Sequence, residues 1–365
     1  MKTKHLAVAF ATLSILHPQL SIVAQGSLTP PGAPAATMKS LDQVYAKLDP
    51  RTAITNAATG YTVNVPGSYY LTTNLTVSSG NGITIAANGV TLDLNGFTLS
   101  SPAASATGYG ILLNGTLSDI TIVNGHIRGG VTNNGSGVYG GSGFGYGIYY
   151  SGGLPANVVV SKVSVAGVLN TGIYLGSENS TVVEACMVTT AGGSGIFAAT
   201  IKGSVAIDCG AAAISCNQVS DSRGVSTGGY GIYASATAIN CYGQSSSNYG
   251  LFVYTAQNCY GQSVSSYGLY AIHVAQNCYG FSNSSYGLSA PTAQNCRGES
   301  NSSIGLSASS ALNCRGAGYG GGAGVSAYIA NSCYGYSASG TGLTATYGNF
   351  CFGSSVSVLN KYNMP

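Results

Sequence analysis

The sequence predicts an all-β solenoid, a tower of short stacked coils, and two observations lead to this prediction. A Gly followed by Ile, Leu or Val recurs along the chain, and its last seven copies, from Gly231 to Gly342, are 18 or 19 residues apart. Only 6% of the residues are charged, while 54 of the 365 are Gly. A repeat of this size buries its apolar face only by stacking on its neighbours. Short strands joined by Gly, Ser and Asn turns also account for the sparse charge.

The number of coils follows from this Gly-Ile/Leu marker. Twelve markers predict about twelve coils, and the segment from Tyr61 to Ser100 is expected to add one or two, which gives 12–14 coils. A Gly-rich insertion from Gly129 to Gly145 lengthens one of them. The markers begin at Gly110, Gly147, Gly172, Gly195, Ala213, Gly231, Gly250, Gly268, Gly287, Gly305, Gly324 and Gly342.

Each coil has the same predicted layout. In Gly-Leu-x-Ala, the Leu and Ala side chains face inward from one short strand. The later Asn-Cys-x-Gly-x-Ser motif follows a turn, and its Asn tolerates the left-handed backbone angles of a sharp corner. The Cys behind the corner faces inward as a small apolar residue. We expect the amides of one corner column to bond to one another, namely Asn240, Asn258, Asn277, Asn295 and Asn313.

Three stretches carry a resemblance to a known superfamily. VTLDLNGFTL (90–99), ITIVNGHIRG (120–129) and VVEACMV (182–188) resemble coils of the right-handed parallel β-helix, or pectate-lyase-like, superfamily, and the resemblance covers roughly residues 61–353. The stretch GSLTPPGAPAATMKSLDQVYAKLDPRTAI (26–54) and the ending NKYNMP resemble a group of exported bacterial β-helix repeat proteins, which implies no particular activity. A left-handed hexapeptide helix also has 18-residue coils, but no apolar-Gly pair recurs every six residues here. We therefore expect a right-handed parallel β-helix solenoid with a short N-terminal capping helix.

The domain boundaries are predicted as follows. Residues 1–24 read as a signal peptide, because Lys2 and Lys4 precede an apolar run of eleven residues. That run is too short to span a bilayer, and no longer apolar run follows. Residues 25–60 contain a Pro/Ala linker and the capping helix, 61–355 the β-helix, and 356–365 a C-terminal cap or tail. These features predict a secreted protein, extracellular or on the cell surface.

Charge limits the partners. Without Lys2 and Lys4 the chain has 10 basic and 9 acidic residues, a net charge of +1. This balance gives no electrostatic basis for binding nucleic acid or anionic membranes. We expect a polysaccharide or a component of the cell surface or matrix as the partner, with no cofactor. The sequence indicates no particular oligomeric state.

The ten cysteines are predicted to be buried free thiols. Cys186 and Cys209 are assigned to the same slot of earlier coils, and Cys216 to the first strand. Disulfides are disfavoured because stacked Cβ atoms point in parallel, and metal binding is disfavoured because no C-x-x-C pair exists. The remaining seven form one ladder: Cys241, Cys259, Cys278, Cys296, Cys314, Cys333 and Cys351.

The resemblance implies where catalysis would occur. Enzymes of this superfamily act on acidic polysaccharides along the first strand stack, and they need carboxylates, often for Ca²⁺, with an Arg or Lys base, or paired carboxylates. No catalytic residue is favoured here, because the outward position after each marker holds neither an acid nor a base. These positions are Leu112, Tyr149, Tyr174, Phe197, Ser215, Tyr233, Phe252, Tyr270, Ser289, Ser307, Ser326 and Thr344. The alternative, a lyase or glycoside hydrolase with Ca²⁺ as its only expected cofactor, would use His126, Arg128, Lys162 and Asp93.

Aromatic residues give the other hypothesis. Exposed aromatic rows stack on sugar rings or on another protein, although stacked rings also simply stabilise a parallel sheet. We therefore expect a non-catalytic exported protein with a structural or a polysaccharide-binding role. The candidate ligand-binding residues are Tyr149, Tyr174, Phe197, Tyr233, Phe252 and Tyr270. A second outward row is predicted at Tyr242, Tyr260, Tyr279, Arg297, Arg315, Tyr334 and Phe352.

Overall fold

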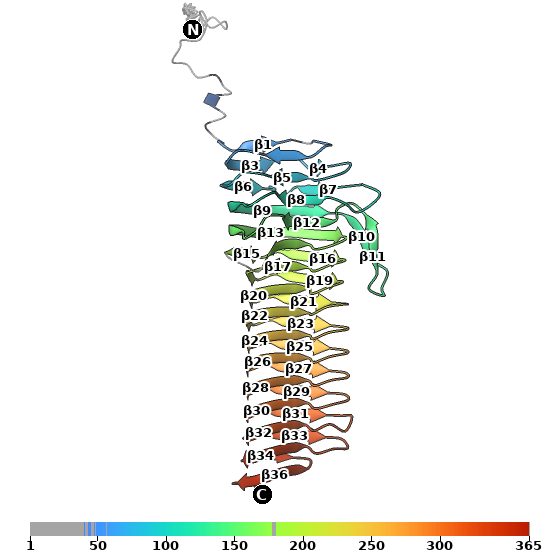
Figure 1. Cartoon of the computed structure of the whole chain (residues 1–365), viewed down its shortest axis with the longest axis vertical. Helices are drawn as coiled ribbons and strands as arrows, with labels where there is room; N and C mark the ends of the chain where they lie inside the picture. The colour runs from blue at the N-terminus through green and yellow to red at the C-terminus, as the bar shows by residue number, and fades with distance from the viewer. Residues whose placement is uncertain are drawn as a thin grey trace, which may run out of the picture. The chain divides into compact units, whose positions relative to one another are not determined.

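The strands of each coil pair in parallel with the equivalent strands of the next coil, so the predicted parallel β-helix is confirmed (Figure 1). The computed structural model describes residues 40, 43–44, 47, 49–55, 57–176 and 180–364. The chain divides into two units, Met1–Pro50 and Arg51–Pro365. In its described part the second unit has about 16 turns rather than the expected 12–14. The further turns come from β1 (Thr52–Ile54) and β36 (Val356–Tyr362), which pair with β3 (Gly67–Leu71) and β34 (Leu343–Asn349) and lie outside the predicted residues 61–355.

Three stacks of strands make up the second unit. The first stack begins with the strands at the marker position: β2 (Tyr61–Val63), β5 (Ile83–Ile85), β8 (Tyr109–Leu113), β12 (Tyr146–Tyr150), β14 (Ile173–Gly176) and β17 (Ile196–Ala198). The second stack begins with β1 (Thr52–Ile54), β3 (Gly67–Leu71), β6 (Val90–Asp93), the first parts of β9 (Ser118–Arg128) and β13 (Ala156–Val168), β15 (Thr181–Glu184) and β18 (Thr200–Lys202).

From the next coil on, one bent strand serves both of these stacks. These strands are β20 (Ile214–Ser220), β22 (Ile232–Ile239), β24 (Leu251–Gln257), β26 (Leu269–Gln276), β28 (Leu288–Gln294), β30 (Leu306–Leu312), β32 (Val325–Asn331), β34 (Leu343–Asn349) and β36 (Val356–Tyr362). The last of them, β36, lies in the segment predicted as a C-terminal cap or tail, and it pairs in parallel with β34.

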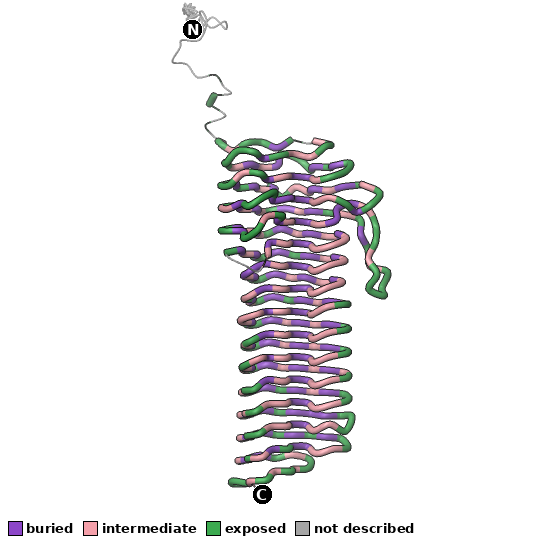
Figure 2. Tube along the Cα trace, in the orientation of Figure 1, coloured by how far each residue is buried: buried purple, intermediate pink, exposed green. Residues whose placement is uncertain are grey.

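The third stack follows the Asn corner. It contains β4 (Leu75–Thr76), β7 (Thr98–Ser100), the second parts of β9 and β13, β16 (Met187–Ala191), β19 (Val205–Cys209), β21 (Arg223–Ser226), β23 (Tyr242–Ser245), β25 (Tyr260–Ser263), β27 (Tyr279–Ser282), β29 (Arg297–Ser300), β31 (Arg315–Gly318), β33 (Tyr334–Ser337) and β35 (Phe352–Gly353). In most strands of the three stacks, buried residues alternate with half-exposed or exposed ones (Figure 2).

The predicted signal peptide and linker, and most of the predicted capping helix, lie outside the described residues. Of that helix, Gln43, Val44 and Lys47 are described, and they are helical. The Val44 backbone N–H donates to the carbonyl oxygen of Ser40 at 3.0 Å. The capping role of this segment stays a prediction.

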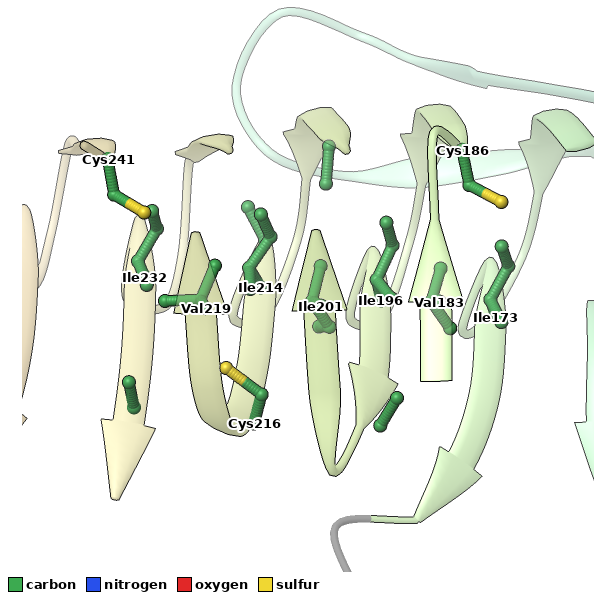
Figure 3. Packing of buried hydrophobic residues seen from close by; sticks show 14 of the residues in the cluster. Ile173, Val183, Cys186, Ile196, Ile201, Ile214, Cys216, Val219, Ile232 and Cys241 are labelled. Atoms are coloured by element: carbon green, nitrogen blue, oxygen red, sulfur yellow. The ribbon is translucent and has the colours of Figure 1, made fainter. Parts of the chain in front are cut away.

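The core is one continuous column of small apolar side chains. In β24 the inward residues Leu251, Val253 and Ala256 are fully buried, and Cys259 behind the corner is 3% exposed. Ile173, Ile196, Ile214 and Ile232 form one row of such residues along the first stack (Figure 3). Full burial of one Leu or Ile side chain stabilises the fold by roughly 1.5–3 kcal/mol. Each added coil therefore stabilises the fold by burying the same few inward side chains.

The corner asparagines behave as predicted. Asn240, Asn258, Asn277, Asn295 and Asn313 all have φ between 53° and 55°, which Asn tolerates better than most residues. From Asn258 on, each side-chain amide donates to the amide oxygen of the Asn in the preceding coil, at 3.1 Å for Asn258, Asn277 and Asn295. The column ends at a carboxylate, because Asn240 donates to Oδ1 of Asp221 at 2.9 Å.

The Ser of Asn-Cys-x-Gly-x-Ser holds the next turn. Ser245, Ser263, Ser282 and Ser300 are almost completely buried, and each hydroxyl donates to a backbone carbonyl of a preceding turn at 2.5 Å. In return, the Ser263 hydroxyl accepts the Ser266 N–H at 2.9 Å. These bonds satisfy backbone groups that the turns leave unpaired.

The Gly-rich insertion forms an antiparallel hairpin, β10 (Gly130–Asn133) and β11 (Tyr139–Ser142), which is fastened to later coils. The Tyr139 hydroxyl donates to Oδ1 of Asp208 at 3.0 Å, and the Asn133 amide donates to the same oxygen at 2.6 Å. Burial raises the pKa of Tyr139 to about 12. A Cβ at Gly210 would lie 2.9 Å from Cε2 of its ring, and a Cβ at Gly192 would lie 2.9 Å from Cβ of Tyr139. The hairpin therefore depends on contacts with coils far along the chain.

In the coils from Gly224 on, the two recurring glycines meet across the interior. A Cβ at Gly261 would lie 2.2 Å from the carbonyl oxygen of Gly268, and a Cβ at Gly268 would lie 2.4 Å from backbone atoms of Phe281. Real Cβ atoms do not approach backbone this closely, so the third stack and the following marker strand require glycine at both positions. This contact explains the Gly of Asn-Cys-Tyr-Gly.

We predict that Gly261→Ala lowers the free energy of unfolding by about 1–3 kcal/mol, the usual range for overpacking a rigid site. Gly153→Ala is the matched control, because nothing lies within 4 Å of a Cβ there. Thermal unfolding followed by circular dichroism compares the two. An unchanged midpoint for Gly261→Ala would contradict the proposed backbone contact.

Candidate functional site

The outward row of the first stack lies in the predicted register. Tyr149 lies opposite Leu112 and Tyr174, Phe197 follows Tyr174, and Ser215 follows Phe197. The same column continues from Ser215 through Tyr233, Phe252, Tyr270, Ser289, Ser307, Ser326 and Thr344. We call the outward surface of these strands the first-stack face. The row carries rings, hydroxyls and one Leu, without a charged side chain.

A second aromatic column on this face was not predicted. Its members each precede the Gly of a marker, so that Tyr-Gly-Ile-Tyr and Tyr-Gly-Leu-Phe place two rings three residues apart. The signal for it was present in the sequence as a Tyr immediately before the marker. The column contains Tyr109, Tyr146, Tyr230, Tyr249, Tyr267 and Tyr286.

The rings of the first-stack face stack on one another. Tyr149 and Tyr174 have centroids 5.1 Å apart at an interplanar angle of 21°, and Tyr233 and Phe252 are 5.5 Å apart at 15°. Tyr249 and Tyr267 stack at 5.2 Å and 8°. All six predicted ligand-binding residues are accordingly only half-exposed. Within a stack, neighbouring rings cover the ring faces, and the edges and hydroxyls remain for solvent or a ligand.

These rings form two groups. The first group runs from Tyr109 to Phe197, and the second from Tyr230 to Tyr286. The coil of β20 separates them, because it carries Ala212 and Ser215 at the two ring positions. Since ring faces are covered inside a group, the ends of the groups are where a face can meet a ligand.

The second predicted outward row lies on the third stack. Tyr242, Tyr260 and Tyr279 follow one another in register, and Arg223 and Arg297 occupy the coils on either side. Arg223 lies over the Tyr242 ring with 5.2 Å from Cζ to the centroid, and Arg297 over Tyr279 with 5.4 Å. An open groove of about 790 Å³ runs between this row and the Asn column.

The described residues of the third stack contain one ion pair. Arg297 pairs with the Glu299 carboxylate, and that carboxylate also accepts a hydrogen bond from the Tyr279 hydroxyl at 2.9 Å. Burial, followed by the bond to Glu299, raises the pKa of Tyr279. Asp221 at the end of the groove accepts from Asn240. This row is therefore held by internal contacts.

The four residues of the catalytic alternative lie on or next to the second and third stacks. Asp93 ends β6, where its carboxylate accepts from Arg51 at 3.2 Å and from the Asn95 N–H at 2.8 Å. His126 and Arg128 point outward from the third-stack part of β9, and Nδ1 of His126 is enclosed without a partner among the described residues.

Lys162 occupies a corner of β13 with φ 56° and is exposed. In the described part of the chain, no hydrogen bond or ion pair joins any two of the four. Asp93 also accepts a hydrogen bond from the Asn124 side-chain amide at 3.3 Å. Its carboxylate is therefore bonded to residues of the corner.

All ten cysteines are free and buried. The seven-membered ladder follows the corner on consecutive coils, and thiols such as Cys278 donate to a backbone carbonyl two residues earlier, here at 3.1 Å. The assignment of Cys209 to this slot was wrong: its register partners are Ala191 and Ser226, in the serine column of the third stack. In its coil the slot holds Ser204, which accepts the Cys186 N–H at 3.2 Å.

The described residues contain neither a cluster of metal-ligating side chains nor a helix that could span a membrane. They contain no group of three or more His, Cys, Asp or Glu side chains placed to hold a metal ion. No helix among them has the length and apolar character that crossing a membrane requires.

Comparisons with known proteins give fold neighbours of low similarity. No family model and no curated protein matches the chain. The Dettilon tailspike protein has a TM-score of 0.31 and 12% identity over 84% of this chain, which spans 60% of the tailspike chain. The A-module of Azotobacter vinelandii mannuronan C-5 epimerase AlgE6 has a TM-score of 0.30 and 11% identity, covering 82% of this chain and 91% of the module. The AlgE4 A-module gives 0.26 and 13%, covering 82% and 89%. Scores this low transfer neither substrate nor activity to this chain.

The buried thiols give a prediction about pH. Burial raises the pKa of the Cys186 thiol to about 11, and burial also raises the pKa of Cys209 and Cys216, whereas a thiol in an unfolded chain titrates near ~8.5. The contribution of the protonated, buried thiols to the free energy of unfolding is therefore complete below the thiol pKa of the unfolded chain. It is lost as pH rises toward 11, because only the unfolded state then releases the proton.

Midpoints of thermal unfolding measured from pH 7.5 to 10.5 test this prediction. Tyrosines titrate in the same range, so Cys186→Ala serves as the control that keeps the tyrosines and lacks one buried thiol. The wild-type midpoint should fall more steeply than that of Cys186→Ala. Native protein at pH 8 should also resist thiol reagents that modify the unfolded chain. Rapid modification of the native thiols would contradict the prediction.

Proposed function

We propose that this chain is an exported, non-catalytic β-helix repeat protein that binds polysaccharide through its first-stack face, as an element of the cell surface or matrix. The observation that carries the proposal is the composition of that face. Its outward columns present tyrosine hydroxyls, ring edges and serine hydroxyls over many coils, with no charged side chain in either ring column. Export is proposed from the predicted signal peptide, residues 1–24.

The chemistry of this face suits a sugar polymer. Tyrosine combines an apolar ring with a polar hydroxyl, which matches the mixed C–H and hydroxyl surface of a sugar. The rings are held in place by their neighbours, so little side-chain entropy is lost on binding. An uncharged contact surface also predicts an affinity that salt changes little.

The enzymatic alternative has weaker support. A lyase or hydrolase needs its acid and base gathered over one bound substrate. Asp93 is engaged with Arg51 and with its own corner, and His126, Arg128 and Lys162 lie off the first-stack face. We therefore do not assign a reaction to this chain.

Affinity electrophoresis through gels cast with neutral and acidic polysaccharides, including pectate and alginate, tests the proposal. We expect retarded migration with intact polymer. Phe252→Ala and Tyr270→Ala should each restore part of the mobility, about three- to tenfold in apparent affinity, because each removes a ring of the face.

Arg128→Ala and Lys162→Ala serve as matched controls and should migrate like the wild type. A cleared zone around the band that these two substitutions abolish would establish the enzyme instead. Free migration in every gel would refute polysaccharide binding and leave a structural role.

A further inference from the structure

The second group of rings ends in a hollow. Tyr270 is the last ring of its column, and a pocket of about 270 Å³ opens beside it, over the coils of β28 and β30. The pocket lies where these strands bend from the first stack to the second. It is lined by Tyr270, Ser289, Ala290, Pro291, Ser307, Ala308 and Ser309.

Tyr270 offers this pocket a ring face. On one side it stacks on Phe252, with centroids 5.4 Å apart and an angle of 25°. On the other side its register partner is Ser289, and the described residues place no ring against Tyr270 from that coil. The side chain that would continue the column is replaced by a hydroxyl, and the space of one ring is left open.

The floor of the pocket supplies hydroxyls that the fold does not use. Among the described residues, the side chains of Ser289, Ser307 and Ser309 have no hydrogen-bond partner. The serines of the third stack differ, because Ser282 and Ser300 each donate to a backbone carbonyl at 2.5 Å. The pocket serines are free to bond to a ligand.

The lining cannot bind a charged ligand through an ion pair, because it has no charged side chain. It contains no Lys, Arg, His, Asp or Glu, so a carboxylate placed there would lose water without gaining a cation. A ligand ring with an apolar face and hydroxyls around its edge matches this lining. Its face can pack against the Tyr270 ring, and its hydroxyls can bond to the serine hydroxyls. The lining also includes Pro291, whose ring fixes φ, and two alanines, whose side chains end at Cβ.

We propose that this pocket is a subsite for a single uncharged sugar ring, which packs against the free face of Tyr270 and bonds to the serine hydroxyls. The inference rests on the proposed polysaccharide binding and narrows it, because the polymer would have to present neutral residues. The sugar continues the aromatic column by taking the place of the missing ring.

The test is ligand-observed NMR on the full chain, titrated with methyl glucosides, galactosides and mannosides, and with methyl glucuronide as the charged comparison. We expect at least one neutral glycoside to bind and the glucuronide to bind about tenfold more weakly or not at all. Tyr270→Ala should weaken binding about tenfold, whereas Tyr270→Phe, which keeps the ring face, should stay within about twofold.

Ser307→Ala and Ser326→Ala form the decisive pair. They lie in the same row on adjacent coils, but only Ser307 lines the pocket. Ser307→Ala should weaken binding about two- to tenfold, the range for one neutral hydrogen bond, and Ser326→Ala should leave it unchanged. Thermal midpoints equal to the wild type confirm that both variants are folded.

Two outcomes overturn the inference. One is that no neutral glycoside binds, and the other is that Ser326→Ala weakens binding as much as Ser307→Ala. If gels still retard the protein in either case, polysaccharide binding stands and the subsite falls. If no gel retards it, the proposed function falls as well.

Discussion

The structure depends on the constant register of its coils, which the close contact between two glycines makes possible. Gly261 and Gly268 bring the third stack and the following marker strand together with no side chain between them. The marker strand then bonds to the next coil, as when the Leu269 N–H donates to the carbonyl oxygen of Gly287 at 3.0 Å. A side chain at either glycine would separate the strands. The columns of the coils from Gly224 on therefore depend on this contact.

Because the register is constant, equivalent residues of successive coils lie above one another and form columns. A corner Asn satisfies its backbone geometry and also bonds to the next Asn, and the amides all point the same way until they meet Asp221. A carboxylate at the donor end of aligned amides is favourable for the same reason that acids favour helix N-termini. The first-stack rings follow the same logic, because each pair of stacked rings adds about 0.5–1.5 kcal/mol beyond the area buried. The residue type chosen for a column decides whether it stabilises the tower or meets a ligand.

Much of this arrangement could be predicted from the sequence. The spacing of the markers placed Ser215 opposite Phe197 and Tyr233 correctly, and it recovered the coil whose marker is Ala213-Ile214. The corner geometry followed from Asn alone. These predictions worked because a repeat of fixed length leaves only one register.

The remainder depends on contacts that no periodicity encodes. The tilt of each ring determines which faces are covered, so the half-exposed state of the aromatic row could not be seen in the sequence. The hairpin is fastened by Asp208, 69 residues after Tyr139, and Cys209 was misplaced because its coil differs from the later ones. The pocket beside Tyr270 appears only when the bend of β28 is known.

The central claim is that ligand recognition belongs to the first-stack face, and residue-resolved tyrosine footprinting with and without a retained polysaccharide tests it most directly. The account predicts protection of Tyr270 and Tyr286, while Tyr334 and Tyr347, on the third and second stacks, keep their reactivity. Protection confined to Tyr334 or Tyr347, with Tyr270 unchanged, would contradict it.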